Sequence, residues 1–432
     1  MKSTRDCITV RPSRTTSARD RDPSRTSNSF PGNASDARKT MPDDPDPHPR
    51  APADTAAAAT SAPNGSSTVT TETANGIDLG SQYYVLDGGQ VIVPELDAHR
   101  RKASNRDLPL VERLEAYEDI IDSEIGDTAL TRLRNLEREF GLRQIYAKFE
   151  GSNPSGSQKD RIAFAQVLDA MRRGYEAVTV ATCGNYGAAL SVAAELGSLR
   201  CIVYIPLNYH TKRVQEIEER GATIVRAGED YEEAVALSRA RAEVEEIYDA
   251  NPGGPNTSIH LRAYGEIAYE IYDDLRDAPA VVAVPVSNGT TLAGIHKGFV
   301  SLYRRGKTSR VPRIVAGSSF RKNPIVQAWL NRNPRCENLH PRFVRETPIN
   351  EPLINWHSID GDHALTAVRQ TDGWAANASD KSLLDFAKLI REREGLNVLP
   401  ASTAGLVALL ERHRRDPLPG DRYIVILTGR KA

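Results

Sequence analysis

The chain has 432 residues, 39% of them hydrophobic and 26% charged, and its formal net charge is -1. This length is sufficient for two domains, and the composition is typical of a globular protein of the cytosol. The balanced charge provides no global field for nucleic acid or an anionic membrane, so we expect neither as a partner. No apolar run approaches the roughly 20 residues of a membrane helix. The cysteines, Cys7, Cys183, Cys201 and Cys336, form no C-x-x-C pair, so neither a zinc site nor a disulfide framework is indicated.

The N-terminal segment is almost free of large apolar side chains. In residues 1–76, Phe30 is the only aromatic residue and Ile8 the only isoleucine or leucine. Such a segment cannot bury enough apolar surface to offset the entropy of ordering, so we predict a disordered polar tail over residues 1–80. It has no apolar run typical of a signal peptide, and its acidic residues argue against a transit peptide. We therefore expect a cytoplasmic protein.

After the tail, apolar and β-branched runs alternate with helical patterns. We predict strands at 91–93, 177–180, 201–205, 222–225, 280–286, 313–316 and 423–427. We predict helices at 188–196, 211–220, 231–246, 267–275, 293–304, 383–394 and 402–413. Strands separated by helices of this length form parallel βαβ units. The expected fold is α/β, with two doubly wound lobes of mostly parallel sheets and the functional site between them.

The lobes are assigned to segments in chain order. Residues 81–160 are expected to form strands and helices that lead into the lysine motif described next. Residues 161–260 are expected to form the smaller lobe, and residues 261–432 the larger lobe, completed by part of 81–160.

The run NPSGSQKDR at residues 153–161 begins as a tight loop and continues as a helix. Ser157 and Asp160 predict a capping box at the helix start. Lys159 would then lie at a helix N-terminus, where the macrodipole and Arg161 disfavour its protonated form. A neutral lysine amine can act as a nucleophile. An isolated lysine, however, is more often an ordinary surface residue.

Two further loops lie between a predicted strand and a predicted helix. The first contains Thr182, Cys183, Gly184, Asn185, Tyr186 and Gly187, and its glycines and free amides suit a carboxylate. The second contains Ser287, Asn288, Gly289, Thr290 and Thr291, and its amides and three hydroxyls suit a phosphate. Taken alone, the first loop is more simply an ordinary turn, and the second is weak evidence for a binding site. Together with the lysine, on one α/β scaffold, they predict a single site.

These motifs resemble those of fold-type II pyridoxal-phosphate enzymes, the tryptophan synthase beta-like superfamily, and threonine synthase most closely. NPSGSQKDR resembles the cofactor-lysine motif, and IGDTAL at 125–130 resembles the opening motif, with Ala129 where proline is usual. The loops at 182–187 and 287–291 resemble the family's T-G-N and phosphate loops. Residues 373–375, 400–404 and 427–429 are similar to late segments of threonine synthases. The resemblance extends from residue 125 to residue 429.

The resemblance implies a lyase or synthase that acts on a small amino acid, as a homodimer. Lys159 would carry pyridoxal phosphate as a Schiff base and move the Cα proton, and Asn185 would hydrogen-bond the phenolic oxygen. Thr428 would face the ring nitrogen, which favours elimination or replacement over transamination. The substrate carboxylate would be surrounded by Thr182, Cys183, Gly184 and Tyr186. The phosphate would be held by Ser287, Asn288, Gly289, Thr290 and Thr291.

The chain departs from the family pattern in several places. Gln158 stands where an aromatic or apolar residue usually precedes the lysine, and Leu399 where glutamate is frequent. Residues 350–360 (NEPLINWHSID) do not match the glycine-asparagine-proline stretch found nearby in threonine synthases. Their His357 is interpreted as structural. We expect these differences to affect the choice of substrate more than the use of the cofactor.

Three functions remain compatible with the sequence. The leading hypothesis is threonine synthase-like elimination or replacement at the β or γ carbon of an amino acid. A second is β-replacement as in cysteine synthases, or dehydration of serine or threonine. A third, of another class, is a cofactor-binding protein without catalysis, although the presence of Lys159, Asn185 and Thr428 argues against a decayed site.

Overall fold

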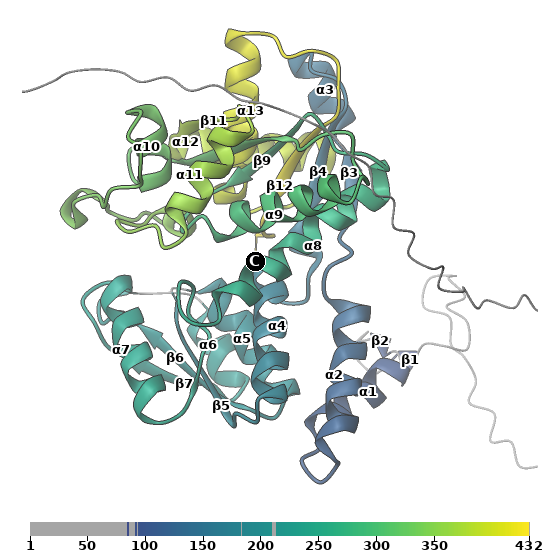
Figure 1. Ribbon diagram of the computed structural model, residues 1–432, viewed down its shortest axis with the longest axis vertical. Coiled ribbons are helices and arrows are strands. Elements are labelled where there is room, and N and C mark those ends of the chain that lie inside the picture. Colours follow the sequence, from purple (N-terminus) through teal and green to yellow (C-terminus); the bar gives the residue numbers. More distant parts are fainter. Residues whose placement is uncertain (1–83, 86–90, 93, 183, 210–212, 432) are drawn as a thin grey trace, which may run out of the picture. The chain divides into compact units, whose positions relative to one another are not determined.

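The computed structural model describes residues 84–85, 91–92, 94–182, 184–209 and 213–431, and the predicted polar tail lies outside them. At the start of this part, β1 (Tyr84–Val85) pairs antiparallel with β2 (Val91–Ile92). Two larger sheets follow, with helices packed around them (Figure 1). Within the described residues, none of the helices has the length and apolar character needed to cross a bilayer.

The larger sheet has six strands in the order β11-β10-β9-β12-β4-β3. Its strands are β3 (Leu130–Arg132), β4 (Ile145–Phe149), β9 (Val281–Pro285), β10 (Arg313–Ser319), β11 (Trp374–Ala378) and β12 (Tyr423–Leu427). All neighbours are parallel except β3, which runs antiparallel to β4. The central strands β9 and β12 are buried along their whole length, because helices cover both faces of a parallel sheet.

The smaller sheet has four parallel strands in the order β7-β6-β5-β8. They are β5 (Ala177–Ala181), β6 (Arg200–Ile205), β7 (Thr223–Arg226) and β8 (Tyr248–Asp249). The two mostly parallel sheets confirm the predicted α/β fold. The loops that follow β5 and β9 leave the carboxyl ends of strands in two different sheets, and residues of both loops line one cavity.

The helices are distributed between the two sheets. Those around the smaller sheet are α4 (Lys159–Arg172), α5 (Asn185–Leu196), α6 (Val214–Glu219) and α7 (Tyr231–Val244). The remaining helices are α1 (Pro94–Ser104), α2 (Leu110–Glu124), α3 (Arg134–Phe140), α8 (Thr257–Leu275), α9 (Thr290–Arg304), α10 (Pro324–Leu330), α11 (Gly361–Gln370), α12 (Asp380–Glu394) and α13 (Ala404–Arg415). Short 3-10 turns occur at Glu150–Ser152, Pro341–Phe343, Glu351–Leu353 and Pro400–Thr403.

Several predicted boundaries differ from the structure. The helix predicted at 267–275 begins at Thr257, ten residues earlier. The first half of α8 was missed because it carries His260 and Tyr264, which are polar and yet fully buried, so the apolar spacing is weak there. The helices predicted at 188–196 and 293–304 begin at Asn185 and Thr290. Both of the latter start within the loops predicted to bind anions, so the last residues of each loop form the first turn of a helix.

Candidate active site

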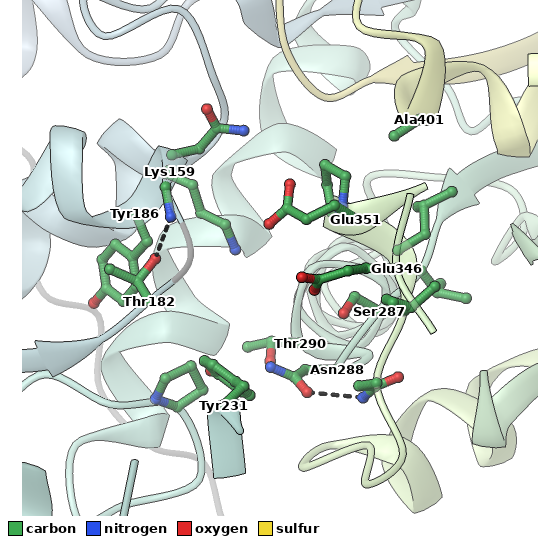
Figure 2. A pocket seen from close by; sticks show the side chains of 18 of the residues that line it. Lys159, Thr182, Tyr186, Tyr231, Ser287, Asn288, Thr290, Glu346, Glu351 and Ala401 are labelled. Carbon is green, nitrogen blue, oxygen red and sulfur yellow. Dashed lines mark hydrogen bonds between the residues drawn. The ribbon is translucent and has the colours of Figure 1, made fainter. Parts of the chain in front are cut away.

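A cavity of about 510 Å³ lies at the carboxyl ends of β5, β9 and β12. The predicted site residues that line it are Lys159, Thr182, Gly184, Asn185, Tyr186, Ser287, Asn288, Gly289, Thr290, Thr291 and Thr428. Figure 2 shows Lys159 and Tyr186 on one side of this cavity and Ser287 on the opposite side. Cys183 lies outside the described residues. The motifs that are far apart in the sequence therefore meet in one place.

Lys159 is the first residue of α4, and its side chain is half-buried. Its Nζ donates to the Tyr264 hydroxyl at 3.4 Å. The same atom lies 5.8 Å from the centre of the Tyr186 ring and 5.9 Å from that of Tyr264. Burial lowers the pKa of Lys159 to about 8, since a desolvated ammonium is disfavoured. Near neutral pH a useful fraction of this amine is therefore unprotonated and nucleophilic.

Two details of the predicted helix start are wrong. Asp160 does not complete a capping box with Ser157, because its Oδ2 accepts a hydrogen bond from the amide of Ser155 at 2.9 Å instead. Arg161 does not act on the lysine amine. Its guanidinium forms buried ion pairs with Glu150 at 2.6 Å and Glu270 at 2.5 Å. The lowered pKa of Lys159 results from burial and not from a neighbouring cation.

The loop after β5 is fixed by hydrogen bonds to other elements. Arg213 Nη1 donates to Asn185 Oδ1 at 2.7 Å, which leaves the Nδ2 end of that amide as a donor. Tyr186 is buried, and its hydroxyl donates to the carbonyl of Ala250 at 2.8 Å. His260 Nε2 lies 3.0 Å from the same hydroxyl. The Tyr186 hydroxyl is thus satisfied inside the protein, and the ring is the part of this residue that lies near Lys159.

The loop after β9 leads into the N-terminus of α9. Gly289 has a φ of 89°, and a Cβ at this position would lie 2.9 Å from the Cβ of Ala364 and 3.0 Å from the carbonyl oxygen of Asp360. Only glycine is therefore accommodated without strain. Thr290 donates its hydroxyl to Asp360, whereas its backbone amide lies in the first turn of a 15-residue helix. Such amides and the positive end of the helix dipole favour an anion.

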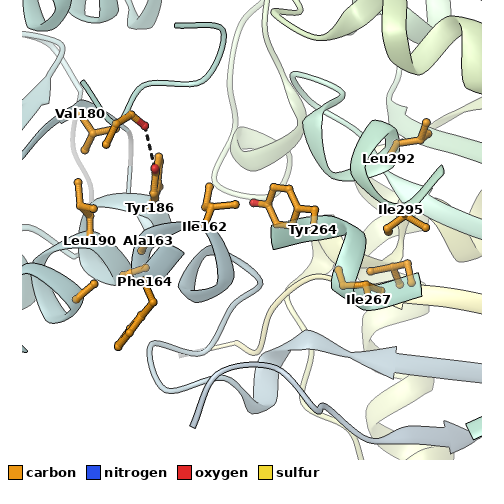
Figure 3. Packing of buried hydrophobic residues seen from close by; sticks show 14 of the residues in the cluster. Ile162, Ala163, Phe164, Val180, Tyr186, Leu190, Tyr264, Ile267, Leu292 and Ile295 are labelled. Atoms are coloured by element: carbon orange, nitrogen blue, oxygen red, sulfur yellow. Dashed lines mark hydrogen bonds between the residues drawn. The ribbon is translucent and has the colours of Figure 1, made fainter. Parts of the chain in front are cut away.

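Tyr264 lies on the long helix α8, which packs against α9. Figure 3 shows Tyr264 and Ile267 near Leu292 and Ile295 in one continuous core cluster. The contact is close because Gly298 faces Gly265, and a Cβ on Gly298 would come within 2.5 Å of the Gly265 carbonyl oxygen. This backbone approach holds α8, which carries the partner of Lys159, against the helix that begins at the anion loop.

Thr428 follows the last strand, and its Oγ1 lies 3.1 Å from the hydroxyl of Ser402. The cavity lining also includes residues that the sequence did not single out: His260, Tyr264, Glu229, Asp230, Glu232, Glu346 and Glu351. No motif marks them. The only signal was the departure of residues 350–360 from the family pattern, and Glu351, Asn355 and Trp356 from that stretch do line the cavity. His357 is exposed and lies 2.8 Å from Asn338, consistent with a structural role.

Two mostly parallel sheets, a lysine amine with a lowered pKa and two helix N-termini surround one cavity, an arrangement suited to a ligand that carries an aldehyde and an anionic group. The chain belongs to the pyridoxal-phosphate dependent enzyme family, whose model matches residues 121–429. It is 31% identical to threonine synthase of Methanocaldococcus jannaschii over 70% of this chain and 74% of that protein. It is 30% identical to threonine synthase of Bacillus sp. strain ULM1, over 70% and 82% of the two chains.

Solved structures share the fold. Maize serine racemase matches with a TM-score of 0.62 at 18% identity, over 74% of this chain and 92% of that chain. The processed form of threonine deaminase isoform 2 from Solanum lycopersicum matches with a TM-score of 0.60 at 13% identity, over 77% and 92% of the two chains. The chain is therefore a pyridoxal-phosphate-dependent lyase, similar to threonine synthase, of the fold type predicted from its motifs.

Proposed function

We propose that the chain eliminates or replaces a group at the β or γ carbon of a small amino acid, with Lys159 as the residue that holds pyridoxal phosphate. The observation that supports this assignment most directly is the Lys159 amine. It lies in the cavity between the two helix N-termini, and burial lowers its pKa to about 8. An aldehyde reacts with the neutral form of an amine, so this lysine is suited to bind the cofactor covalently.

The cavity residues fit this cofactor. Gln158 Oε1 and His260 Nδ1 are buried and have no hydrogen-bond partner among the described residues, although both residues line the cavity. Buried polar atoms of this kind are normally satisfied, so a polar ligand that completes their hydrogen bonding is expected. The helix N-terminus at Gly289 supplies amide donors for a phosphate, with no side chain at Gly289 in the way.

Each predicted residue then has a role. The cofactor phosphate would be held by Ser287, Asn288, Gly289, Thr290 and Thr291. For Thr290 the backbone amide is the donor, since its hydroxyl is bonded to Asp360. Asn185, oriented by Arg213, would donate its Nδ2 to the phenolic oxygen. The substrate carboxylate would be bound at the start of α5 by Thr182, Gly184 and Tyr186, together with Cys183 from outside the described residues.

Pyridoxal phosphate supplies an electron sink for negative charge at the substrate Cα. Thr428 offers the ring nitrogen a neutral hydroxyl. A hydroxyl protonates that nitrogen less than a carboxylate would, which favours elimination and replacement over transamination. Lys159 is the base for the Cα proton when its amine is free. The Tyr264 hydroxyl, 3.4 Å from Nζ, orients that amine.

The assignment of Lys159 is tested by reducing the cofactor-loaded protein with borohydride and mapping the modified peptide. A pyridoxyl group on Lys159 is expected. Its absence there, with the group on another lysine, would disprove the assignment. Lys159→Ala should lose the cofactor absorbance and at least about 100-fold of the turnover, whereas Lys381→Ala, an exposed lysine on α12, should keep both.

The reaction is identified by product. Phosphate release from O-phospho-L-homoserine, sulfide-dependent turnover of O-acetyl-L-serine and ketoacid formation from L-serine or L-threonine separate the three catalytic alternatives. We also propose, from the family resemblance, a homodimer located in the cytoplasm. Light scattering on the purified protein measures the oligomeric state directly, and a monomer would contradict it.

A further inference from the structure

The cavity around Lys159 is rich in acidic side chains. Among the described residues, five carboxyl side chains line it, Glu229, Asp230, Glu232, Glu346 and Glu351, against two basic side chains, Lys159 and Arg345, and burial makes the Lys159 amine easier to deprotonate. Of the first three acids, Glu232 lies in the first turn of α7, and Asp230 and Glu229 immediately precede this helix, which packs on the smaller sheet. The other two lie in the segment between α10 and α11. In Figure 2, Glu346 and Glu351 extend from that segment into the cavity, across from Lys159.

Asp230 has a structural role, whereas three of the other acids lack a cationic neighbour among the described residues. Asp230 caps α7 by accepting from the amide of Glu233 at 2.9 Å, and it also accepts from Trp356 Nε1 at 3.2 Å. Glu232 Oε1 is buried and accepts no hydrogen bond from the described residues. In the described part of the chain, no ion pair joins Glu232, Glu346 or Glu351 to a basic side chain within 4.0 Å.

Burial has an electrostatic cost at two of these acids. It raises the pKa of Glu232 and that of Glu351 to about 7, although backbone amides and the Tyr209 hydroxyl oppose the shift. Burying a carboxylate without a counterion is unfavourable, and a bound cation relieves that cost. Among the described residues, no three His, Cys, Asp or Glu side chains are arranged to hold a metal ion. A cationic group on a bound organic ligand would relieve the cost in the same way.

We propose that the substrate is an amino acid whose side chain carries a positive charge, an amino or other cationic group at or beyond the β carbon, and that Glu232, Glu346 and Glu351 bind it. This inference rests on the function proposed above and names its substrate class. The α-carboxylate binds at α5, and the cationic end binds between α7 and the α10–α11 segment. A phosphorylated amino acid would instead place a dianion against this acidic surface, which is repelled.

Binding is tested with amino acids of matched size and different charge. L-2,4-diaminobutyrate, L-norvaline and L-aspartate are titrated into the cofactor-loaded protein, and dissociation constants are taken from the change in cofactor absorbance. The cationic amino acid is expected to bind at least about tenfold more tightly than the neutral one, and the anionic one most weakly. The difference in dissociation constant between the cationic and the neutral amino acid should decrease as the pH falls below about 7, where Glu232 and Glu351 become protonated.

Turnover is tested with L-2,3-diaminopropionate against O-phospho-L-homoserine and O-phospho-L-serine. In the cationic substrate the Cα proton passes to Lys159, and the Cβ–N bond breaks with its electron pair leaving on nitrogen. One water then converts the product to pyruvate, with release of two ammonia molecules in total. We expect kcat/KM for this substrate to exceed that for either phosphorylated amino acid.

Charge variants connect the preference to the named residues. Glu351→Gln and Glu232→Gln should each raise the dissociation constant of L-2,4-diaminobutyrate about tenfold and leave that of L-norvaline unchanged. Glu346→Lys, at an exposed position of the cavity lining, should shift the substrate preference toward O-phospho-L-serine. Glu243→Gln is the matched control, because it removes the same charge from an exposed site at the far end of α7.

The two proposals fail in different ways. If no amino acid changes the cofactor absorbance or gives a ketoacid, the proposed function is wrong. If amino acids are turned over but neutral or phosphorylated ones are preferred, the charge inference is overturned while the proposed function stands. The same holds if the glutamate variants weaken the binding of L-norvaline as much as the binding of L-2,4-diaminobutyrate.

Discussion

At the scale of single residues, the environment of Lys159 gives a pH dependence that is independent of any substrate. Its lowered pKa, about 8, means that the amine is mostly protonated below pH 8 and mostly neutral above it. Because the neutral amine attacks the aldehyde, the rate at which cofactor-free protein binds pyridoxal phosphate should rise with pH and level off above about 8. Stopped-flow absorbance measures this rate. A midpoint near 10.5, the ordinary value for lysine, would show that the amine is not desolvated.

A second residue-scale prediction concerns Gly289. Gly289→Ala places a Cβ against Ala364 and Asp360 and forces a positive φ on a non-glycine residue. We expect a loss of about 2 kcal/mol or more in the free energy of unfolding, measured with urea, and weaker binding of the cofactor. Gly395→Ala is the matched control. It has a φ of 75° but no atom within 4 Å of the added Cβ, so it isolates the cost of the backbone conformation.

Cavity-lining residues that lie in sequence motifs could be singled out from the sequence, and lining residues outside such motifs could not. Lys159, Asn185 and Gly289 were identified because glycine, small polar residues and helix starts leave a local pattern, and all three line the cavity. Tyr264 and His260 come from the interior of a helix, where a buried polar residue resembles an exposed one. Glu346 and Glu351 come from a segment without regular spacing. Their proximity to Lys159 depends on the tertiary fold.

At the scale of elements, the predictions were best where burial is greatest. The strand predicted at 423–427 coincides with β12, and β9 is within one residue of its predicted limits at each end, because both are continuous apolar runs. The strands β4 and β11 were missed. β4 contains a lysine, Lys148, that is fully buried against Glu270, and β11 contains Asn377, so neither forms an apolar run.

The contact between α8 and α9 gives a prediction at this scale. Gly298→Ala introduces a Cβ that would lie 2.5 Å from the Gly265 carbonyl oxygen and 2.7 Å from the Cβ of Ala268. Since a backbone atom cannot move away easily, the helices must separate, and we expect a loss of about 1–3 kcal/mol in the free energy of unfolding. Lys297→Ala, at the neighbouring exposed position of α9, should change it by less than about 0.5 kcal/mol.

At the scale of the whole molecule, a buried network of charges connects β4, the turn after it, α4 and α8. Lys148 and Arg161 pair with Glu270 at 2.6 and 2.5 Å, and Arg161 also pairs with Glu150. Burial by itself would raise the pKa of Glu270, but Arg161 and Lys148 outweigh it and hold that pKa at about 2. The network joins a strand of the larger sheet to the helix that begins with Lys159.

This network predicts the behaviour of the protein in acid. The pKa of Glu270 is lower in the folded chain than its unfolded value of about 4.3. The stability that it contributes is therefore present above about pH 5 and is lost as the pH falls toward 2. Glu270→Gln should cost about 3–5 kcal/mol at pH 7, because two buried cations lose a counterion.

The difference in the free energy of unfolding between Glu270→Gln and the natural protein should decrease as the pH is lowered from 5 to 2. Urea unfolding at several pH values measures it, and a difference that does not depend on pH would contradict the assignment of the pKa shift to this network.

The segment between α10 and α11 donates acidic groups to the cavity but no strand to either sheet. The lysine, the anion loops and the charge network all belong to other parts of the chain. In a duplicated copy, substitutions at the acidic positions of this stretch would alter which compounds are accepted, as long as Asp360 at its end kept its bond to Thr290 of the anion loop. New specificities in such a lineage would then arise by a few substitutions within one loop, and the same substitutions offer a direct route for redesign in the laboratory.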